Sequence, residues 1–418
     1  MTVSAGQNSA SGGGMSAALV LARRNALLLS ASQAIAGSAA PIAISLGGLA
    51  GAYLLGEDKS LATAPVTGFN IGVAVGALPA AWLMRRIGRR YGFISGAALL
   101  ALGGLVAAIA LFRHDFMLFA VALAIIGTGA AFTQQYRFAA ADGAPSIFKA
   151  SAISWVLAGG VFAAIIGPQT VIFTREAFTP VEFAGGFISI IPLAAIAMVV
   201  LSFLRIPRDS VVGDEDHDET PARPLLTIIT QRRFITAMIC GIGSYALMSF
   251  MMTGAPLAMV GCGFSPDLAT IGIQWHVMAM YAPSFFTGRL IARFGRDTIT
   301  GAGLLILLGC AVVAGMGIEL WNFWLALILL GIGWNFGFIG ATAMVTSTYH
   351  ASEKNAVQGF HDVTLFSCVA AASLMSGKVL TNWGWETVSL MFWPVAVFCL
   401  AVLGAQMFSD RRQARAAT

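Results

Sequence analysis

Two pairs of side chains, each with members four residues apart, are the strongest candidates for chemistry in this sequence. Met248 and Met252 lie in GSYALMSFMMTGAP, and His276 and Met280 lie in QWHVMAMYAP. A spacing of four residues places both members of a pair on one face of a helix. Thioethers and a neutral imidazole are soft, uncharged ligands, which favour Cu(I) over hard cations. Packing is the competing interpretation, because methionine commonly fills gaps in apolar helices.

The elements that must position these side chains are predicted to be membrane-spanning helices. The chain has 418 residues, of which 58% are hydrophobic and 10% are charged, and its mean hydropathy is +0.82. A soluble domain would carry about a quarter charged residues. Apolar stretches of about 20 residues are long enough to cross a bilayer. We predict an all-α membrane protein with twelve transmembrane helices, at 26–54, 61–84, 92–112, 116–138, 150–173, 182–204, 234–259, 267–291, 298–318, 321–346, 355–378 and 385–408.

The predicted seventh and eighth helices run in opposite directions, which determines whether the two pairs can meet. Met248 is expected roughly 16 Å below the outer membrane surface, and Met252 lies one turn nearer the outside. His276 is expected roughly 14 Å and Met280 roughly 20 Å below the same surface. If the two helices are adjacent, these four side chains are expected to line one path.

Basic residues gather in alternate loops, together with both chain ends. The richer set of loops and ends holds Arg23, Arg24, Arg85, Arg86, Arg89, Arg90, Lys149, Arg205, Arg208, Arg223, Arg232, Arg233, Arg293, Arg296, Lys354, Arg411, Arg412 and Arg415. The opposite loops hold only Lys59, Arg113, Arg175 and Lys378. The positive-inside rule predicts that both termini are cytoplasmic. The net charge of +5 therefore reports topology in a lipid bilayer, and we expect no nucleic-acid partner.

The longest polar interval, RIPRDSVVGDEDHDETPARPLLTIITQRR, divides the chain into two similar halves. LMRRIGRR after the second predicted helix matches LIARFGRD after the eighth, and IIGTGAAF in the fourth matches LLGIGWNF in the tenth. Such an internal repeat predicts two pseudo-symmetric six-helix bundles. The predicted organisation is a disordered N-terminal tail at 1–22, an N-terminal bundle at 23–204, a cytoplasmic linker at 205–233, a C-terminal bundle at 234–408 and a cytoplasmic tail at 409–418.

The repeated motif resembles the signature of the major facilitator superfamily. AWLMRRIGRR (residues 81–90) is similar to the family's G-x-L-a-D-r-x-G-r-r pattern, with Arg85 where the family usually has Asp, and GRLIARFGRD (residues 288–297) is similar to its second copy. The resemblance covers nearly the whole chain. It implies a carrier whose halves rock about a substrate site near the membrane midplane. The sequence contains no GxxxxGK[ST] loop, nucleophile elbow or HExxH motif, so we expect gradient-driven transport and no enzyme.

The MxxxM and HxxxM pairs resemble those of the CcoA-like (CalT) branch of the superfamily, which comprises bacterial copper importers. The resemblance implies that Met248, Met252, His276 and Met280 bind copper. It also implies copper import across the bacterial inner membrane, in support of cbb3-type cytochrome c oxidase assembly. Copper is then a transported substrate and no prosthetic group is expected. Cytoplasmic or membrane copper-handling proteins are the implied partners, and a monomer is expected.

Two alternatives to copper import remain open. The same branch includes riboflavin carriers, so a proton-coupled importer of riboflavin or another small organic molecule is the main alternative. A non-transporting copper receptor or sensor is the other. Functional thiols are a feature of the copper-importing family, which makes Cys240 and Cys262 candidates for a thiol relay. No CxxC spacing indicates a disulfide framework or a zinc site.

Polar groups within the predicted spans are candidates for coupling and for substrate binding. His361 with Asp362, and Arg137, are candidates for proton coupling or for a gate contact between the halves. Six further side chains are candidates for lining a cavity, where they would hydrogen-bond to and stack on a ring-shaped substrate. They are Gln33, Asn70, Gln134, Gln135, Trp334 and Asn335.

Overall fold

The computed structural model describes residues 6–56, 58–145, 147–205 and 223–416, and the regular structure in this part of the chain is helical. The first six membrane passes are α1 (Gly6–Ala36) with α2 (Ala39–Leu55), α3 (Ala64–Ile87), α4 (Arg89–Phe112), α5 (Phe116–Thr133) with α6 (Tyr136–Asp142), α7 (Lys149–Thr174), and α8 (Ala184–Ile188) with α9 (Ile190–Ser202). The last six are α11 (Arg232–Gly261), α12 (Pro266–Tyr281) with α13 (Ser284–Phe294), α14 (Arg296–Gly315), α15 (Leu320–Val345), α16 (Lys354–Leu390) and α17 (Phe392–Ala416).

The number of membrane passes follows from the apolar helices and from two breaks. Ten stretches of the described residues are long and apolar enough to cross a membrane. One of them, Ala356–Arg412, breaks at Gly384, whose φ of 78° lies outside the helical region, and therefore makes two passes. α12 and α13 together make one more, interrupted at Pro283, which has no amide hydrogen to donate. The prediction of an all-α membrane protein with twelve transmembrane helices is confirmed.

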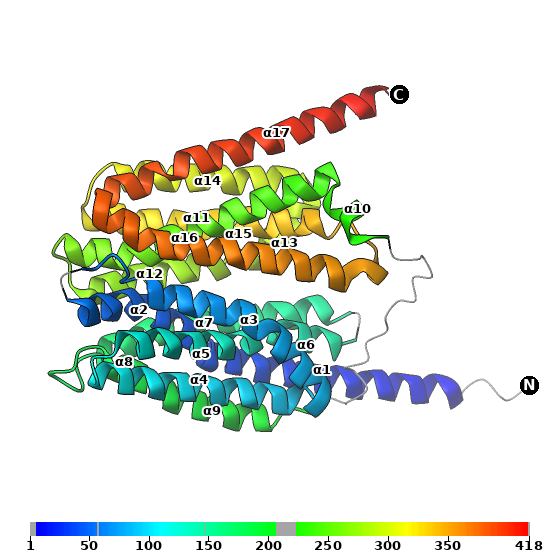
Figure 1. The fold of residues 1–418 in the computed structure, drawn as a ribbon. Helices are drawn as coiled ribbons and strands as arrows, with labels where there is room; N and C mark the ends of the chain where they lie inside the picture. Colours follow the sequence, from blue (N-terminus) through cyan, green and yellow to red (C-terminus); the bar gives the residue numbers. More distant parts are fainter. Residues whose placement is uncertain (1–5, 57, 146, 206–222, 417–418) are drawn as a thin grey trace, which may run out of the picture.

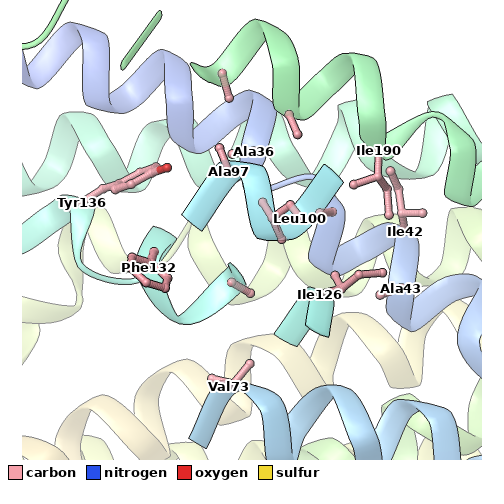
Figure 2. Packing of buried hydrophobic residues seen from close by; sticks show 14 of the residues in the cluster. Ala36, Ile42, Ala43, Val73, Ala97, Leu100, Ile126, Phe132, Tyr136 and Ile190 are labelled. Carbon is pink, nitrogen blue, oxygen red and sulfur yellow. The ribbon is translucent and has the colours of Figure 1, made fainter. Parts of the chain in front are cut away.

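The passes form two bundles that lie side by side, and both chain ends lie at the same end of the molecule (Figure 1). The N-terminal half comprises α1 to α9. In its core, small side chains such as Ala97 pack beside larger ones such as Leu100, Ile126 and Phe132 (Figure 2). The C-terminal half comprises α11 to α17 and has a core of its own. Because each half buries its own core, the halves can move as units.

Three segments that were predicted to be tails or a linker contain helix in the structure. The tail predicted to be disordered at 1–22 is helical from Gly6, because a stable spanning helix extends by one hydrogen bond for each residue added and α1 contains no proline. For the same reason α17 continues through most of the predicted tail at 409–418, to Ala416. The predicted linker at 205–233 contains the short helix α10 (Leu225–Ile229) and the start of α11, and its residues 206–222 lie outside the described chain.

The two copies of the repeated motif share their backbone geometry. Gly88 and Gly295 both have a φ of 84°, with ψ values of 157° and 152°. A residue with a Cβ is strained in this conformation, so both turns require glycine. The internal repeat found in the sequence therefore extends to the structure of the two turns, each of which joins a pair of spanning helices.

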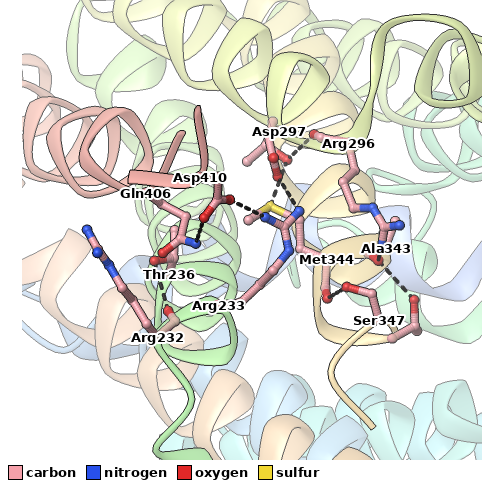
Figure 3. Close-up of polar contacts among 12 residues, drawn as sticks. Arg232, Arg233, Thr236, Arg296, Asp297, Ala343, Met344, Ser347, Gln406 and Asp410 are labelled. Carbon is pink, nitrogen blue, oxygen red and sulfur yellow. Dashed lines mark hydrogen bonds and ion pairs between the residues drawn. The ribbon is translucent and has the colours of Figure 1, made fainter. Parts of the chain in front are cut away.

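Within each half, ion pairs join helix ends on the side of the molecule where the chain termini lie. In the N-terminal half, Arg89 at the start of α4 pairs with Asp142 at the end of α6. In the C-terminal half, Arg233 of α11 reaches two other helices (Figure 3). Its Nη2 lies 2.8 Å from Asp297 Oδ1 of α14 and its Nη1 lies 3.2 Å from Asp410 Oδ2 of α17. Each of these contacts joins helices of one half.

Closely packed glycines hold α3 against α5. Gly68, Gly72 and Gly76 are spaced by four residues, a pattern typical of close helix approach. A Cβ on Gly72 would lie 2.1 Å from the carbonyl oxygen of Ala124. A backbone atom cannot move aside as a flexible side chain can, so this position excludes any larger residue.

We expect Gly72→Val to destabilise the N-terminal half by about 1–3 kcal/mol, because the added carbons force α3 and α5 apart. The measurement is the apparent melting temperature of the purified protein. Gly309→Val is the matched control, since a Cβ at Gly309 in α14 meets nothing within 4 Å. Equal melting temperatures for the two variants would contradict this account of the packing.

Candidate functional site

The two halves contact each other at the ends of the helices opposite the chain termini, which we call the outer ends. Arg175 follows the last turn of α7 and Asp267 lies in the first turn of α12, and Arg175 Nε is 2.8 Å from Asp267 Oδ1. Deeper along the same two helices, Gln169 Nε2 donates a hydrogen bond to Gln274 Oε1 at 2.9 Å. A charge pair and an amide pair therefore join α7 to α12.

A second outer contact lies between α3 and α16. The hydroxyl of Thr63 donates to the carbonyl oxygen of Leu374 at 3.4 Å. Gly377 faces the same threonine so closely that a Cβ there would lie 2.5 Å from its Oγ1. Gly48 of α2 faces Leu257 of α11, where a Cβ would lie 3.4 Å from the leucine side chain. The two halves are therefore joined at three places at their outer ends.

Toward the end of the molecule at which the chain termini lie, charged side chains of both halves are exposed to solvent. Arg137 of α6 is exposed, and it lies within electrostatic range of Asp362 of α16 in the other half. The Asp362 side chain is 58% exposed, and its Oδ1 lies 2.8 Å from His361 Nδ1. We expect the substrate site of a carrier to lie between the halves, around Arg137 and Asp362, and we refer to this region as the central cavity.

Four aromatic side chains of the C-terminal half form a cluster near the middle of their helices, which we call the aromatic cluster. Its members are Tyr245 of α11, Trp334 and Phe338 of α15, and Phe366 of α16. The Tyr245 ring centroid lies 5.4, 5.0 and 5.8 Å from those of Trp334, Phe338 and Phe366, all edge-to-face. Trp334 and Phe338 stack at 5.3 Å and 18°. Phe366 also packs against the core of the N-terminal half, so the cluster lies where the halves face each other.

Polar groups converge beside the aromatic cluster. Tyr281 is the last residue of α12 and packs against Gly160 of α7, where a Cβ would lie 3.0 Å from its ring. Arg137 lies within electrostatic range of both Tyr281 and Tyr245. The electrostatic surroundings of this N-terminal-half guanidinium therefore include two phenols of the C-terminal half. All three groups can donate hydrogen bonds.

The amide side chains predicted to line a cavity lie in several environments. Gln134 is exposed, and Gln33 and Gln135 are half-buried. Asn70 is half-buried too, and its Nδ2 is shielded from solvent without a hydrogen-bond partner. Gln33 lies against Gly159 of α7, whose Cβ would come 3.0 Å from the Gln33 Cβ. Their part in binding stays a prediction.

Asn335 does not line the cavity, which corrects the prediction for this residue. It has no exposed surface, and its Nδ2 donates to the Met280 carbonyl oxygen and to Ser284 Oγ, both at 2.7 Å. Thr287 Oγ1 donates to Asn335 Oδ1 at 2.6 Å. The helix breaks at Pro283, between Met280 and Ser284. Asn335 provides hydrogen-bond partners for the polar groups that the break leaves without a partner in the helix. Its role is to hold α12 and α13 against α15.

The copper-motif side chains lie inside the C-terminal half. His276 has no exposed surface, Met248 and Met252 are 2% and 5% exposed, and Met280 is half-buried. His276 Nδ1 lies 2.9 Å from the Leu327 carbonyl oxygen of α15, which makes Nδ1 the protonated nitrogen, and Nε2 is buried without a partner. The ring therefore points at α15, within its own half. That the four side chains line one path stays a prediction.

The cysteines do not form a chain of neighbouring thiols along α11. Cys240 is buried near the cytoplasmic end of this helix, and Cys262 is exposed just after its outer end. At 1.5 Å per residue these two are about 33 Å apart, too far for direct transfer. Cys310 is buried, and its Sγ lies 3.4 Å from Met251 Sδ. This contact is part of the packing between α11 and α14.

A separate pocket of about 470 Å³ opens at the cytoplasmic ends of α1 and α7. It is lined by Leu19, Arg23, Ile147, Phe148, Ser151 and Trp155. All of these residues belong to the N-terminal half, so the pocket cannot close by movement of one half against the other. The central cavity, which both halves bound, is the better candidate for a transport site.

Four aromatic residues at the interface between the halves were not predicted from the sequence: Tyr245, Tyr281, Phe338 and Phe366. A usable signal existed for the two tyrosines, because a hydroxyl in the middle of an apolar span needs a polar neighbour. No comparable signal marks Phe338 or Phe366, since phenylalanine is common on every face of a membrane helix. Their position beside Tyr245 follows from how α11, α15 and α16 are rotated against one another.

Comparison with known proteins agrees with the fold. The model of the Major Facilitator Superfamily matches residues 25–372, so the chain belongs to this superfamily of membrane transporters. The nucleoside transporter NupG has a similar structure, with a TM-score of 0.70 and 15% identity over 92% of this chain and 99% of that one. The POT family transporter PepTSo is similar too, with a TM-score of 0.69 and 13% identity over 93% of this chain and 98% of that one.

Two curated relatives cover most of the chain. The riboflavin transporter RfnT of Brucella anthropi is 48% identical over 382 residues, which are 91% of this chain and 95% of the relative. The MFS-type transporter YddS of Bacillus subtilis is 30% identical over 88% of each chain. The chain is thus a multi-pass membrane protein of a transporter family, which is not a class of enzymes.

The outer closure generates a prediction about the balance between conformations. Arg175→Glu places like charges opposite each other, and losing a partly exposed ion pair of roughly 1 kcal/mol should shift the ratio of open to closed outer ends about fivefold. The measurement is the distance distribution between spin labels on Cys262 and on Lys59→Cys, which lie at the outer ends of different halves.

The second substitution Asp267→Arg should restore the short distance, because it returns opposite charges to the pair. Glu176→Gln is the control, since Glu176 contacts Arg175 within the same half and its side chain is 71% exposed. An unchanged distance distribution in Arg175→Glu would show that this ion pair does not hold the outer ends together.

Proposed function

We propose that this protein imports riboflavin across the bacterial inner membrane by alternating access of the central cavity. The observation that carries the proposal is the aromatic cluster at the interface between the halves. Riboflavin consists of a flat three-ring system and a ribityl chain, and flat rings bind aromatic side chains by offset or edge-to-face contact. The similarity to a riboflavin transporter supports the same substrate.

The polar residues of the cavity suit the remainder of such a substrate. The ribityl chain carries hydroxyl groups, which need both donors and acceptors when they leave water. The exposed or half-buried amides of Gln33, Gln134 and Gln135 offer both. An apolar wall with a small number of polar groups is the usual composition of a small-molecule site.

Uptake of an uncharged substrate against a gradient needs a coupled ion. We assign this role to the neighbouring pair His361 and Asp362, which lies at the cytoplasmic side of the central cavity and can hold one proton between its members. We also propose that both termini are cytoplasmic, which the distribution of basic residues supports. A single chain contains both halves that bound the cavity, so a monomer suffices for transport.

Copper import is the second candidate, favoured by one observation. His276 presents its Nδ1 to a backbone carbonyl and leaves Nε2 without a partner, which is the arrangement of many histidines that bind metals. Against copper as cargo, Met248, Met252 and His276 are buried within one half, whereas a transported ion must be reached from each side in turn. The same burial weighs against a copper receptor open to solvent.

Uptake of radioactive riboflavin and of copper, measured in parallel in cells that lack their own riboflavin importer, tests the proposed function. We expect wild type to accumulate riboflavin and to leave copper at the level of cells with an empty vector. A triple variant with Met248→Leu, Met252→Leu and Met280→Leu keeps side-chain volume but removes the thioethers. It should retain riboflavin uptake within about twofold, since swaps of this kind disturb packing little.

Wild type could instead accumulate copper, and the triple variant could abolish this at an equal protein level in the membrane. That result would reject riboflavin as the main cargo and support copper import. Absence of uptake of either compound, by protein that reaches the membrane and is folded, would reject both candidates.

A further inference from the structure

We propose that the pocket at the ends of α1 and α7 binds an anionic phospholipid, whose phosphate contacts Arg23 and whose acyl chains lie along apolar side chains. We call this site the Arg23 pocket. Its basis is a cavity in which one cation lies beside aromatic and aliphatic side chains, at the edge of two membrane spans. The inference does not depend on which substrate the protein carries.

The Arg23 pocket lies where two apolar spans begin. Ala18 and Ser151 are the first residues of these spans, and Arg23 and Trp155 follow them by about one helical turn. Lipid headgroups occupy this level of a bilayer, where tryptophan is enriched and arginine extends its guanidinium toward water. A phospholipid beside α1 and α7 therefore has its phosphate at the height of the pocket.

The polar part of the pocket suits a phosphate. The Arg23 side chain is exposed, and its Cζ lies 5.9 Å from the centroid of the Phe148 ring, which holds the cation at the pocket wall. Among the described residues, no carboxylate lies within ion-pair distance of Arg23. The neighbouring Arg24 is already engaged, since its Nη2 donates to the Phe203 carbonyl oxygen at 3.0 Å. Ser151 supplies a hydroxyl donor to the same pocket.

The charge of the lining favours a lipid with a net negative charge. The six residues that line the pocket include one arginine and no aspartate or glutamate. A phosphate therefore finds a cation there, whereas the ammonium group of a zwitterionic lipid finds no ion-pair partner. Basic side chains at a membrane surface attract anionic lipids for the same reason.

The apolar part of the pocket suits the start of the acyl chains. Phe148 and Trp155 pack edge-to-face with centroids 5.1 Å apart, and Leu19 and Ile147 complete the apolar lining. The serine hydroxyl of Ser30 donates to the Trp155 carbonyl oxygen at 2.6 Å, which fixes α7 against α1. A volume of about 470 Å³ is typical of a site for an organic molecule and exceeds what a lone phosphate ion fills.

Exposed apolar side chains continue from the pocket along both helices. Leu27 shares a face of α1 with Arg23, and Phe162 shares a face of α7 with Trp155. Both side chains are exposed, and both lie farther into their spans than the pocket does. The acyl chains of a lipid held at Arg23 therefore have an apolar surface to follow toward the middle of the bilayer.

Native mass spectrometry of the purified full-length protein in neutral detergent tests the proposal, with phosphatidylglycerol and phosphatidylcholine of identical acyl chains as probes. Wild type should retain one phosphatidylglycerol, bound about fivefold more tightly than phosphatidylcholine, which is the effect of one basic residue near a lipid surface. Inorganic phosphate and glycerol 3-phosphate carry the anion without the chains. Neither should displace phosphatidylglycerol at the concentration at which this lipid saturates the protein.

Two variants change the pocket in different ways. Arg23→Gln removes the charge and should weaken phosphatidylglycerol binding about fivefold, to the level of phosphatidylcholine. Ser151→Phe keeps the charge but fills the cavity, and it should abolish retention of both lipids. Arg412→Gln is the matched control, because Arg412 is exposed and its Cζ lies 4.5 Å from the centroid of the Phe408 ring, but it does not line this pocket. It should bind phosphatidylglycerol as wild type does.

Three results would overturn the proposal. The first is equal retention of the two lipids by wild type. The second is phosphatidylglycerol binding that Arg23→Gln weakens no more than Arg412→Gln does. The third is displacement of phosphatidylglycerol by inorganic phosphate at the lipid's own saturating concentration, which would make the pocket an anion site and not a lipid site.

Discussion

The contact between α7 and α12 at the outer ends determines what the rest of the molecule can do. Arg175 with Asp267, and Gln169 with Gln274, join two bundles that otherwise have separate cores. This ion pair and this amide hydrogen bond stabilise the arrangement in which the outer ends are joined. They are weak enough for the halves to separate there and to form contacts elsewhere. Arg137 and Asp362 belong to different halves, and both are exposed to solvent away from these contacts. The position of the cavity therefore follows from where the halves touch.

The break between α12 and α13 is the second structural constraint on the site. Pro283 interrupts the backbone hydrogen bonds of this pass, and buried polar groups left open in a membrane need partners. Asn335 supplies them from α15 and so fixes the end of α12 in place. Tyr281 is the residue at that end. Asn335 thereby positions Tyr281, which packs against Gly160 of α7 in the other half.

Much of the fold could be predicted from the sequence, because it depends on properties of consecutive residues. Span length, the distribution of arginine and the repeated glycine turns require no knowledge of tertiary contacts. The extent of α1 and α17 was not predictable in the same way, since a helix continues beyond the membrane wherever no residue stops it. The close approach at Gly72 was readable from its spacing, and the structure confirms it.

The site was less predictable because it depends on how each helix is rotated about its axis. A spacing of four residues shows that His276 and Met280 share a face, but it does not show that the His276 ring points at the Leu327 carbonyl of α15. Likewise Asn335 and Trp334 are neighbours in sequence, yet one is enclosed between helices and the other belongs to the aromatic cluster at the interface. Only the packed structure separates binding residues from supporting ones.

The most direct test of this account is an experimental structure of the protein with riboflavin bound. We predict ring density between the halves, against Tyr245 and Trp334. Riboflavin density that lies elsewhere, such as the pocket beside Trp155, would contradict it. So would a metal ion bound at His276 Nε2 in a protein whose central cavity stays empty at saturating riboflavin.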